Sequence, residues 1–307
     1  MEIETENLTR KFGERTAVDN VTLKVNEGEV FGFLGPNGAG KTTTVRMLCC
    51  QISKTSGNAR IGDFEVDREE DRLEIRKTVG LLPENVGLYE NLSAYNNLDF
   101  YGKLYEVPSG KREENIKRLL KLLGLWERKD DAVGGFSKGT KQKLAIARAL
   151  VHDPQVLFLD EPTANLDPLA SKTVRDFILE LKKEKRTIFL NTHNLDEAER
   201  ICDRIGVLKT KLLAVGPPED LERSISSRKT VVHLESIADP VLAAVKKLST
   251  VKNVRTSENK LILDMDVPEK DNPQLVRVIV AAGGDIRYVT ELTSTLEDVY
   301  LKLVRGA

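Results

Sequence analysis

The chain has 307 residues, more than a single typical domain, which predicts two domains. Its 47 Lys and Arg nearly balance its 48 Asp and Glu, so there is no overall basic footprint and we expect no nucleic-acid partner. No apolar stretch approaches the roughly 20 residues that cross a bilayer, and the acidic start M-E-I-E-T-E-N is no secretory signal, so we expect a cytoplasmic protein.

The three cysteines, Cys49, Cys50 and Cys202, are too few and too poorly spaced for a metal site or a disulfide framework. We predict that they are small core residues. Cys49 and Cys50 fall within a helix predicted after residue 43, where a thiol behaves as a compact hydrophobe.

The first informative element is an apolar run over residues 30–34, followed directly by G-P-N-G-A-G-K-T-T over residues 35–43. A buried strand, a glycine-rich turn and the N-terminus of a helix are the parts that hold a nucleoside triphosphate. The sequence therefore predicts that this chain binds ATP or GTP. The predicted nucleotide-binding residues of this loop are Gly35, Pro36, Asn37, Gly38, Ala39, Gly40, Lys41, Thr42 and Thr43.

Each residue type in this loop has a chemical use. Glycines let the backbone curl so that consecutive N–H groups point at the phosphates, where a side chain would obstruct the ligand. Lys41 supplies a mobile positive charge for the β- and γ-phosphates, and the Thr42 hydroxyl is placed to coordinate Mg²⁺. Thr43 is a further candidate for a phosphate contact.

Residues 91–134 predict a small helical subdomain, which the next helix extends to about residue 150. Apolar side chains recur there at helical intervals in two stripes, and such stripes are more often core than interface. The first stripe is Leu92, Tyr95, Leu98 and Tyr101, and the second is Ile116, Leu119, Leu120 and Leu123.

Another helix is predicted after F-S-K-G-T at residues 136–140. Leu144 and Val151 lie at helical spacing, and Ser137 is well suited to cap the start of the helix. The exposed N–H groups of a capped helix can receive a phosphate. Because the loop at 35–43 already holds phosphates, this second phosphate site would be redundant within one molecule.

The run V-L-F-L-D-E at residues 156–161 is the second nucleotide element. Its four apolar residues predict a strand buried on both faces of a parallel sheet, and its carboxylates follow at the strand end, where chemistry sits in such sheets. We expect Asp160 to hold Mg²⁺ through its water shell. Successive side chains of a strand alternate in direction, so Glu161 points away from the side on which Asp160 serves the metal. We therefore expect Glu161 to polarise the attacking water.

The first domain is predicted to end near G-P-P at residues 216–218, because consecutive prolines interrupt an ordinary helix. A short helix over 219–224 and a linker at 226–228 follow. We therefore predict domains over residues 1–225 and 226–307.

The second domain changes to a β-α-β-β-α-β order, which predicts a ferredoxin-like unit. A further helix is expected at its C-terminal side, over residues 296–304. The expected strands are residues 230–234, 251–255, 261–265 and 286–289, and the expected helices between them are residues 240–248 and 273–282.

The order of these motifs resembles the ATP-binding cassette family. F-S-K-G-T stands where the family has its L-S-G-G-Q signature: Ser137 and Gly139 are kept, while Lys138 and Thr140 depart from the consensus in a way that resembles exporter ATPase subunits. The resemblance implies that the signature contacts the γ-phosphate held by the other subunit of a head-to-tail dimer, which removes the redundancy. Ser137 and Gly139 then belong to the nucleotide-binding residues.

The resemblance also implies the fold. The expected fold class is α/β: a P-loop NTPase cassette with a mixed sheet core and a helical subdomain, followed by a smaller C-terminal α+β ferredoxin-like domain. The resemblance to the cassette covers roughly residues 1–225. The tail, particularly T-S-T-L-E-D-V-Y-L, resembles the C-terminal extension of drug, sodium and polysaccharide exporter subunits, where it would support dimerisation or regulation, or act as a stabilising appendage.

Further site residues follow from the resemblance. Phe12 matches the aromatic residue that stacks on adenine, a contact that makes no hydrogen-bond demands. His193 follows the apolar run T-I-F-L and corresponds to the switch histidine that contacts the γ-phosphate. The loop N-L-D at residues 165–167 matches the segment after the catalytic carboxylate, where Asp167 helps to organise the dimer interface. Glu161, His193 and Lys41 are the implied catalytic residues.

One position departs from the family pattern. The family commonly has glutamine in the loop that senses the γ-phosphate and touches the membrane partner, whereas V-G-L-L-P-E-N places Glu84 there. An ionised glutamate only accepts hydrogen bonds and adds negative charge near the phosphates. Glu84 remains a candidate ligand of the metal or its water, and Tyr89 and Glu90 are candidate contacts to a membrane subunit.

The motifs together predict the ATP-hydrolysing motor subunit of an ABC transporter of the exporter type, with ATP and Mg²⁺ as cofactors. The implied partners are a second ATPase subunit, in a homodimer or heterodimer, and a separate transmembrane permease. The permease would hold this cytoplasmic chain at the inner face of the cell membrane. The alternative is a soluble cassette ATPase that acts on the ribosome, on DNA or on iron-sulfur assembly machinery.

Overall fold

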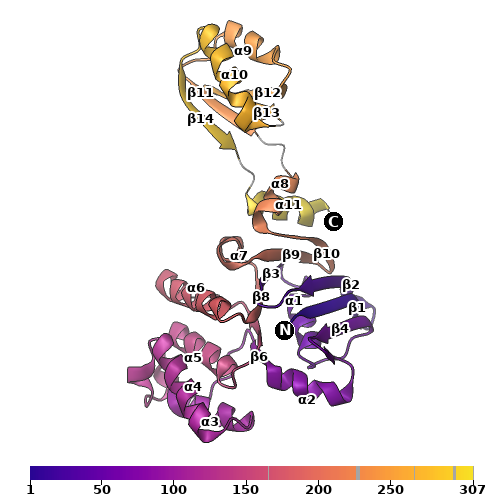
Figure 1. Cartoon of the computed structure of the whole chain (residues 1–307), viewed down its shortest axis with the longest axis vertical. Coiled ribbons are helices and arrows are strands. Elements are labelled where there is room, and N and C mark those ends of the chain that lie inside the picture. The colour runs from indigo at the N-terminus through magenta and orange to yellow at the C-terminus, as the bar shows by residue number, and fades with distance from the viewer. Residues whose placement is uncertain (165, 226–228, 266, 293–294, 307) are drawn as a thin grey trace. The chain divides into compact units, whose positions relative to one another are not determined.

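The chain folds around separate groups of apolar side chains, one gathered about Phe31 and Phe33 and another about Val232 and Leu263. The structure is a computed structural model that describes residues 1–164, 166–225, 229–265, 267–292 and 295–306. It divides into two units, Met1–Pro218 and Glu219–Gly306, which are described separately (Figure 1).

The division lies directly after Pro218, the first residue of helix α8 (Pro218–Ile225), whereas the predicted boundary lies after residue 225. The short helix expected after the two prolines does form, but it groups with the C-terminal unit. The predicted linker at 226–228 lies outside the described residues.

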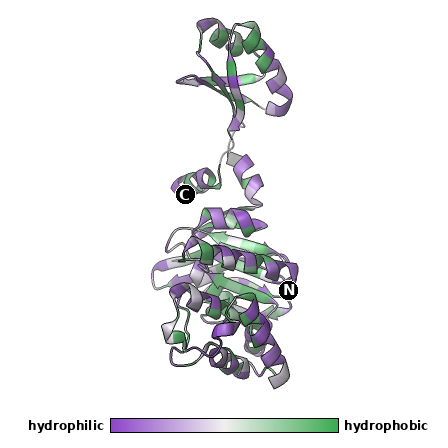
Figure 2. Ribbon diagram, turned by 90° about the vertical axis from the view of Figure 1, so that its left-hand side faces the viewer, coloured by the Kyte–Doolittle hydropathy of each residue, from purple (hydrophilic) through white to green (hydrophobic). Residues whose placement is uncertain are grey.

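The centre of the first unit is a sheet in the order β10-β9-β3-β8-β7-β6. Neighbouring strands run parallel except β9 and β10, which are antiparallel. Every residue of β3, β7 and β8 is buried, as expected for apolar strands covered on both faces. In Figure 2, green strands lie within the first unit, and the helices around them carry both purple and green residues. The strands are β3 (Val30–Leu34), β6 (Val79–Leu82), β7 (Val156–Asp160), β8 (Thr187–Thr192), β9 (Arg204–Lys209) and β10 (Lys211–Gly216).

A smaller antiparallel sheet in the order β2-β1-β4-β5 completes this core. Its inward-facing residues join the same apolar cluster as Phe31 and Met47. The strands are β1 (Ile3–Phe12), β2 (Arg15–Val25), β4 (Ser56–Ile61) and β5 (Phe64–Glu65). The helices around the two sheets are α1 (Lys41–Leu48), α2 (Glu69–Thr78), α6 (Pro168–Lys183) and α7 (Leu195–Ile201).

The predicted helical subdomain is present between β6 and β7. It consists of α3 (Ala94–Leu104), α4 (Ser109–Leu122), two short 3₁₀ turns (Trp126–Arg128 and Val133–Gly135) and α5 (Lys138–Leu150). The second predicted stripe is core, because Ile116, Leu119, Leu120 and Leu123 are all buried. The mixed sheet with a helical subdomain confirms the expected cassette fold.

The C-terminal unit has the predicted β-α-β-β-α-β order. Its antiparallel sheet runs β12-β13-β11-β14, the strand order of a ferredoxin-like unit. The elements are β11 (Lys229–Leu234), α9 (Asp239–Lys246), β12 (Val251–Ser257), β13 (Lys260–Met265), α10 (Pro268–Ala281), β14 (Ile286–Leu292) and α11 (Leu296–Gly306).

The predicted start of α10 at Pro273 is wrong. The helix begins at Pro268, which occupies its first turn, where a missing N–H costs nothing, and Pro273 lies inside it. The start of the quoted tail motif, residues 293–294, lies outside the described residues, whereas the helix expected over 296–304 is present as α11.

Two of the cysteines are core residues as predicted. Cys49 and Cys202 are buried, and burial raises the pKa of both thiols well above the ordinary value, which disfavours the reactive thiolate. Cys50 is only half-buried, so the prediction holds for it in part.

His152 is a structural residue of the first unit. Its ring stacks on Tyr105 with centroids 3.8 Å apart, and its Nε2 lies 3.1 Å from the Val79 carbonyl oxygen. The other ring nitrogen, Nδ1, is buried without a partner, so protonation there would bury an unsatisfied positive charge. Burial accordingly lowers the pKa of His152 from 6.5 to about 4.

This buried histidine predicts acid sensitivity. A histidine whose pKa is lowered in the fold stabilises the protein above the unfolded pKa of 6.5, and this contribution is lost as the pH falls from 6.5 toward 4. We expect His152→Gln to remove about 3 kcal/mol of the pH dependence of the unfolding free energy over that window. Urea unfolding of the full chain at pH 7.5 and pH 4 measures this, and equal pH slopes in variant and wild type would contradict the assignment.

Candidate functional site

The phosphate loop lies between the end of β3 at Leu34 and the start of α1 at Lys41. Gly38 and Gly40 have φ angles of 80° and 104°, in the left-handed region that side chains rarely adopt. At Gly40 a β-carbon would also lie 2.4 Å from the carbonyl oxygen of Ala17. These two constraints explain why this turn requires glycine.

Lys41 turns back into this loop. Its Nζ donates to the carbonyl oxygen of Gly35 at 2.6 Å and lies 3.4 Å from that of Pro36. Burial lowers the pKa of Lys41, while the negative charges of Glu161 and Asp160 act in the opposite direction. The loop thus holds a desolvated amine beside the backbone that would cradle phosphates.

A hydroxyl and a carboxylate meet at the end of the loop. The Thr42 Oγ1 donates to Oδ2 of Asp160 at 2.9 Å, and Asn191 Nδ2 donates to the other oxygen of Asp160 at 3.2 Å. Asp160 ends β7 and Asn191 lies in the neighbouring β8. Hydroxyl and carboxylate oxygens are hard ligands of the kind that Mg²⁺ prefers, so the oxygens of Thr42 and Asp160 fit a magnesium ion.

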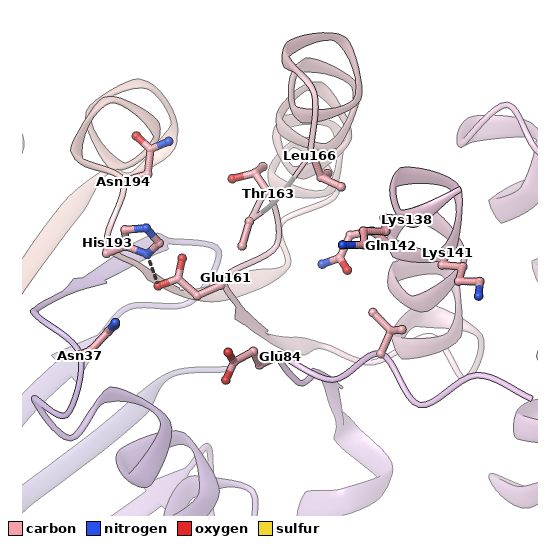
Figure 3. A pocket seen from close by; sticks show the side chains of 12 residues that line it. Asn37, Glu84, Lys138, Lys141, Gln142, Glu161, Thr163, Leu166, His193 and Asn194 are labelled. Carbon is pink, nitrogen blue, oxygen red and sulfur yellow. Dashed lines mark ion pairs between the residues drawn. The ribbon is translucent and has the colours of Figure 1, made fainter. Parts of the chain in front are cut away.

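Glu161 has a different environment from Asp160. Its backbone is left-handed, with φ 51°, and its N–H donates to the carbonyl oxygen of Asn191 at 2.9 Å. Its side chain faces His193, whose Nδ1 lies 2.8 Å from Oε1 of Glu161 (Figure 3). The structure therefore brings together these two predicted catalytic residues, while His193 remains largely exposed.

Two clefts adjoin at Glu161. One, of about 490 Å³, is lined by the phosphate loop from Asn37 to Thr43 together with Phe12, Glu84 and Asp160. The other, of about 550 Å³, lies between the loops of Glu84, Glu161 and His193 and the first turns of α5 (Figure 3). Glu84 lines both clefts, whereas Asn165 of the predicted dimer loop lies outside the described residues.

The predicted signature forms the start of α5. Ser137 is its N-cap: its Oγ accepts from the Thr140 N–H at 3.2 Å. A β-carbon at Gly139 would lie 3.3 Å from Cβ of Ala170, so this turn is close to α6. Ser137 and Gly139 line neither cleft, whereas Lys138, which lies between them, lines the second cleft together with Asn37.

Phe12 lies on the cleft of the phosphate loop and is 48% exposed. The guanidinium of Arg10 lies 4.5 Å from its ring centroid. Asp167 is the N-cap of α6, because its carboxylate accepts from the N–H groups of Leu169 and Ala170. Within one chain, Asp167 therefore stabilises the start of this helix.

The motifs alone did not identify several residues around the site. Gln142 of α5 donates to the Pro162 carbonyl oxygen at 3.0 Å and so links the signature helix to the loop of Glu161. Glu197 is fully buried, its Oε2 accepts from the Thr192 hydroxyl at 2.9 Å, and burial raises its pKa. Asn194 and Glu197 have the spacing of a capping box, which predicts that Glu197 lies in the first turn of a helix. The spacing does not predict that the Glu197 side chain turns into the protein.

A more apolar groove lies away from these clefts, between α2, β6 and the end of α3. Leu73 and Leu104 line it and are 58% and 67% exposed, and Tyr105 lies beside them. The predicted contact residue Tyr89 does not line this groove, and its ring lies 5.1 Å from that of Phe100, centroid to centroid. Exposed apolar side chains around a groove are typical of a surface that binds another protein.

Family models match both units. A model described as "ABC transporter" matches residues 18–164, and one described as "ATP-binding protein DrrA1-3-like, C-terminal domain" matches residues 216–304. A third, described as "AAA domain, putative AbiEii toxin, Type IV TA system", matches residues 132–197.

Among similar proteins, the bacitracin transport ATP-binding protein BcrA of Bacillus licheniformis is 34% identical, over 99% of this chain and 97% of its own. The linearmycin resistance ATP-binding protein LnrL of Bacillus subtilis (strain 168) is 32% identical, over 86% of this chain and 85% of its own.

Solved structures also resemble this chain over part of its length. One, titled "Structure of ATP binding subunit of ABC transporter", superposes with a TM-score of 0.67 at 29% identity, covering 73% of this chain and 93% of its own. A dimeric post-hydrolysis state of the ATP-binding cassette MJ0796 bound to ADP and Pi superposes with a TM-score of 0.64 at 25% identity, covering 70% of this chain and 98% of its own.

Proposed function

This chain belongs to the ATP-binding cassette transporter family and is an ATPase of that family, and from this premise we propose that it is the motor subunit of an exporter. The observation that carries the proposal is the incomplete site in one chain. Lys41, Thr42, Asp160, Glu161 and His193 converge on adjoining clefts, whereas the signature residues Ser137 and Gly139 line neither.

We infer that the chain binds Mg·ATP in the cleft of the phosphate loop. Phe12 would stack on the adenine, the backbone N–H groups of residues 37–43 would hold the phosphates, and Lys41 would move from the Gly35 carbonyl to a phosphate oxygen. Thr42 and Asp160 would hold Mg²⁺, which neutralises phosphate charge when bound. Glu84 is the further candidate for the metal or its water.

Glu161 is the proposed general base. Its Oε1 is engaged by His193, which leaves Oε2 to accept a proton from the attacking water. His193 would fix the carboxylate and contact the γ-phosphate. The adjacent Asp160 is held instead by Thr42 and Asn191, so the two carboxylates have separate tasks.

Closure of the site requires a second subunit, in a homodimer or heterodimer. We propose that Ser137 and Gly139 of one subunit cover the γ-phosphate bound by the other, with the exposed N–H groups of α5 as donors. Nucleotide then favours the closed dimer because it contacts both subunits only in that state, and hydrolysis removes the bridge. Asp167 would lie at this interface.

The proposed second partner is a separate transmembrane permease. No helix within the described ranges is long and apolar enough to cross a membrane. The apolar groove at Leu73, Leu104 and Tyr105 is the surface that we assign to the permease. Tyr89 and Glu90 stay candidate contacts from the sequence and do not line this groove. The chain would then work at the inner face of the cell membrane.

Co-purification tests the function and this surface together. We expect a neighbouring gene to encode a membrane protein, and we expect the wild-type chain, expressed with that protein, to co-purify with it from membranes. Leu104→Asp should reduce the recovered permease by roughly tenfold or more, because it would bury an unpaired charge in the contact. ATP binding should remain unchanged.

Leu122→Asp is the matched control, since Leu122 is 49% exposed on α4 and does not line the groove. Equal recovery of both variants would remove the groove from the proposal. Recovery of the wild-type chain only with ribosomes, or only with another soluble assembly, would instead favour the alternative cassette ATPase.

The names of similar proteins support export of an antimicrobial or similar compound, since BcrA is named for bacitracin transport and LnrL for linearmycin resistance. An identity of about one third does not assign the substrate of a similar protein to this chain, because the motor subunit need not contact the transported compound. For the C-terminal unit, predicted over 226–307, we propose support of dimerisation or regulation.

A further inference from the structure

Arg15 is a feature of the nucleotide cleft that the sequence motifs do not identify. It begins β2 directly after the turn at Gly13 and Glu14, and its backbone is paired with that of Phe12 across this hairpin. Side chains that lie directly opposite in an antiparallel pair project from the same face of the sheet. Arg15 and Phe12 both line the phosphate-loop cleft.

The guanidinium of Arg15 extends toward the phosphate loop. Its Nη2 lies 3.6 Å from the position that a β-carbon on Gly38 would occupy. Gly38 is one of the left-handed glycines at the turn of the loop. Arg15 therefore bridges the space between the exposed ring of Phe12 and the backbone that holds phosphates.

Arg15 is available for a ligand. Across the residues that the structure describes, no carboxylate oxygen lies within 4.0 Å of its guanidinium, and its side chain has no hydrogen bond to the protein. Arg10 on the same hairpin differs, because it donates to the Ser53 carbonyl oxygen at 2.8 Å and lies over the Phe12 ring. Arg10 does not line the cleft, whereas Arg15 does.

The charge balance of the cleft gives Arg15 a purpose. Glu84, Asp160 and Glu161 line it as carboxylates, and Lys41 and Arg15 are its cations. Lys41 is buried in the loop, near the carboxylates. A polyphosphate therefore meets one cation at the inner end of the cleft and needs another at the outer end, where Arg15 lies.

We propose that Arg15 binds the α-phosphate of the nucleotide and thereby joins the base-stacking residue to the phosphate loop. The inference rests on the proposed Mg·ATP site. A nucleotide with its base on Phe12 and its β- and γ-phosphates at residues 38–42 has its α-phosphate between them. A guanidinium presents several donors in one plane and pairs well with phosphate oxygens.

Nucleotide affinity without turnover tests the proposal. Displacement of a fluorescent ATP analogue from the full chain gives dissociation constants for ATP, ADP and AMP at fixed ionic strength. For Arg15→Gln we expect these constants to rise by roughly tenfold, the loss of a charge-assisted hydrogen bond at an exposed site. The factor should be similar for ATP and ADP, since both carry the α-phosphate.

Lys11→Gln is the control, because Lys11 is exposed on the same hairpin but does not line the cleft. It should leave both constants within about twofold, which excludes a general effect of surface charge. Arg15→Lys should retain part of the affinity through its charge.

Two outcomes overturn the proposal. Unchanged constants in Arg15→Gln would remove Arg15 from the site, and a loss for ATP with none for ADP would assign it to the γ-phosphate instead. If the wild-type chain binds none of the nucleotides, the proposed function fails. That outcome is distinguishable from a failure of the Arg15 proposal, because it is seen in the wild-type chain and needs no variant.

Discussion

Glu161→Gln is expected to slow ATP hydrolysis by roughly 10²- to 10⁴-fold, the usual contribution of a general base, and to leave the dissociation constant for ATP within about twofold. Glutamine keeps the shape of the side chain, and its carbonyl oxygen can still accept from His193, which lies 2.8 Å from Oε1 in the native chain. What it loses is the ability to accept a proton from water.

Because ATP then persists, the variant should also accumulate as an ATP-bound dimer. Phosphate release measures turnover, and size-exclusion chromatography with and without Mg·ATP measures the dimer. Glu199→Gln, an exposed change on α7, is the control and should turn over normally. Wild-type turnover in Glu161→Gln would show that another group takes the proton.

Gly139→Asp should abolish hydrolysis while leaving ATP binding intact. The change places a carboxylate at the helix start proposed to meet the γ-phosphate of the other subunit, where like charges repel. The phosphate loop of the same chain is untouched. Gly110→Asp is the matched control, because a β-carbon at Gly110 meets nothing within 4 Å and the position lies at the start of α4.

Mixing variants tests the two-chain site directly. Lys41→Ala should lose ATP binding but keep its signature, whereas Gly139→Asp keeps its phosphate loop. A mixed dimer then has one composite site built from two intact halves. We expect ATPase activity to appear on mixing two inactive variants, and its absence, with mixed dimers present, would refute a site shared between chains.

Much of the site could be predicted because its local conformation is encoded over a few neighbouring residues. Only glycine suits the left-handed turn at Gly40, and an apolar run ending in two carboxylates suits a buried strand such as β7. The cap at Ser137 follows the same local logic. These features hold whatever the rest of the chain does.

For the residues that the motifs missed, no local sequence pattern indicates their position in the site. Arg15 reaches the cleft because it pairs with Phe12 across a hairpin, and Gln142 meets the loop of Glu161 only through the placement of α5. Glu197 has the spacing of a helix cap, but its side chain turns into the protein toward Thr192. Sheet register and helix packing decide such contacts.

The sequence by itself determined the nucleotide chemistry and the order of the elements, because spacing fixes local turns, caps and buried strands. Tertiary structure decided which of these residues meet. Thr42 and Asp160 are 118 positions apart and share a hydrogen bond. They meet because β3 and β7 both pair in parallel with β8, so the carboxyl ends of these strands lie at one edge of the sheet. The same fold keeps Ser137 and Gly139 out of both clefts, as a site completed by a second chain requires.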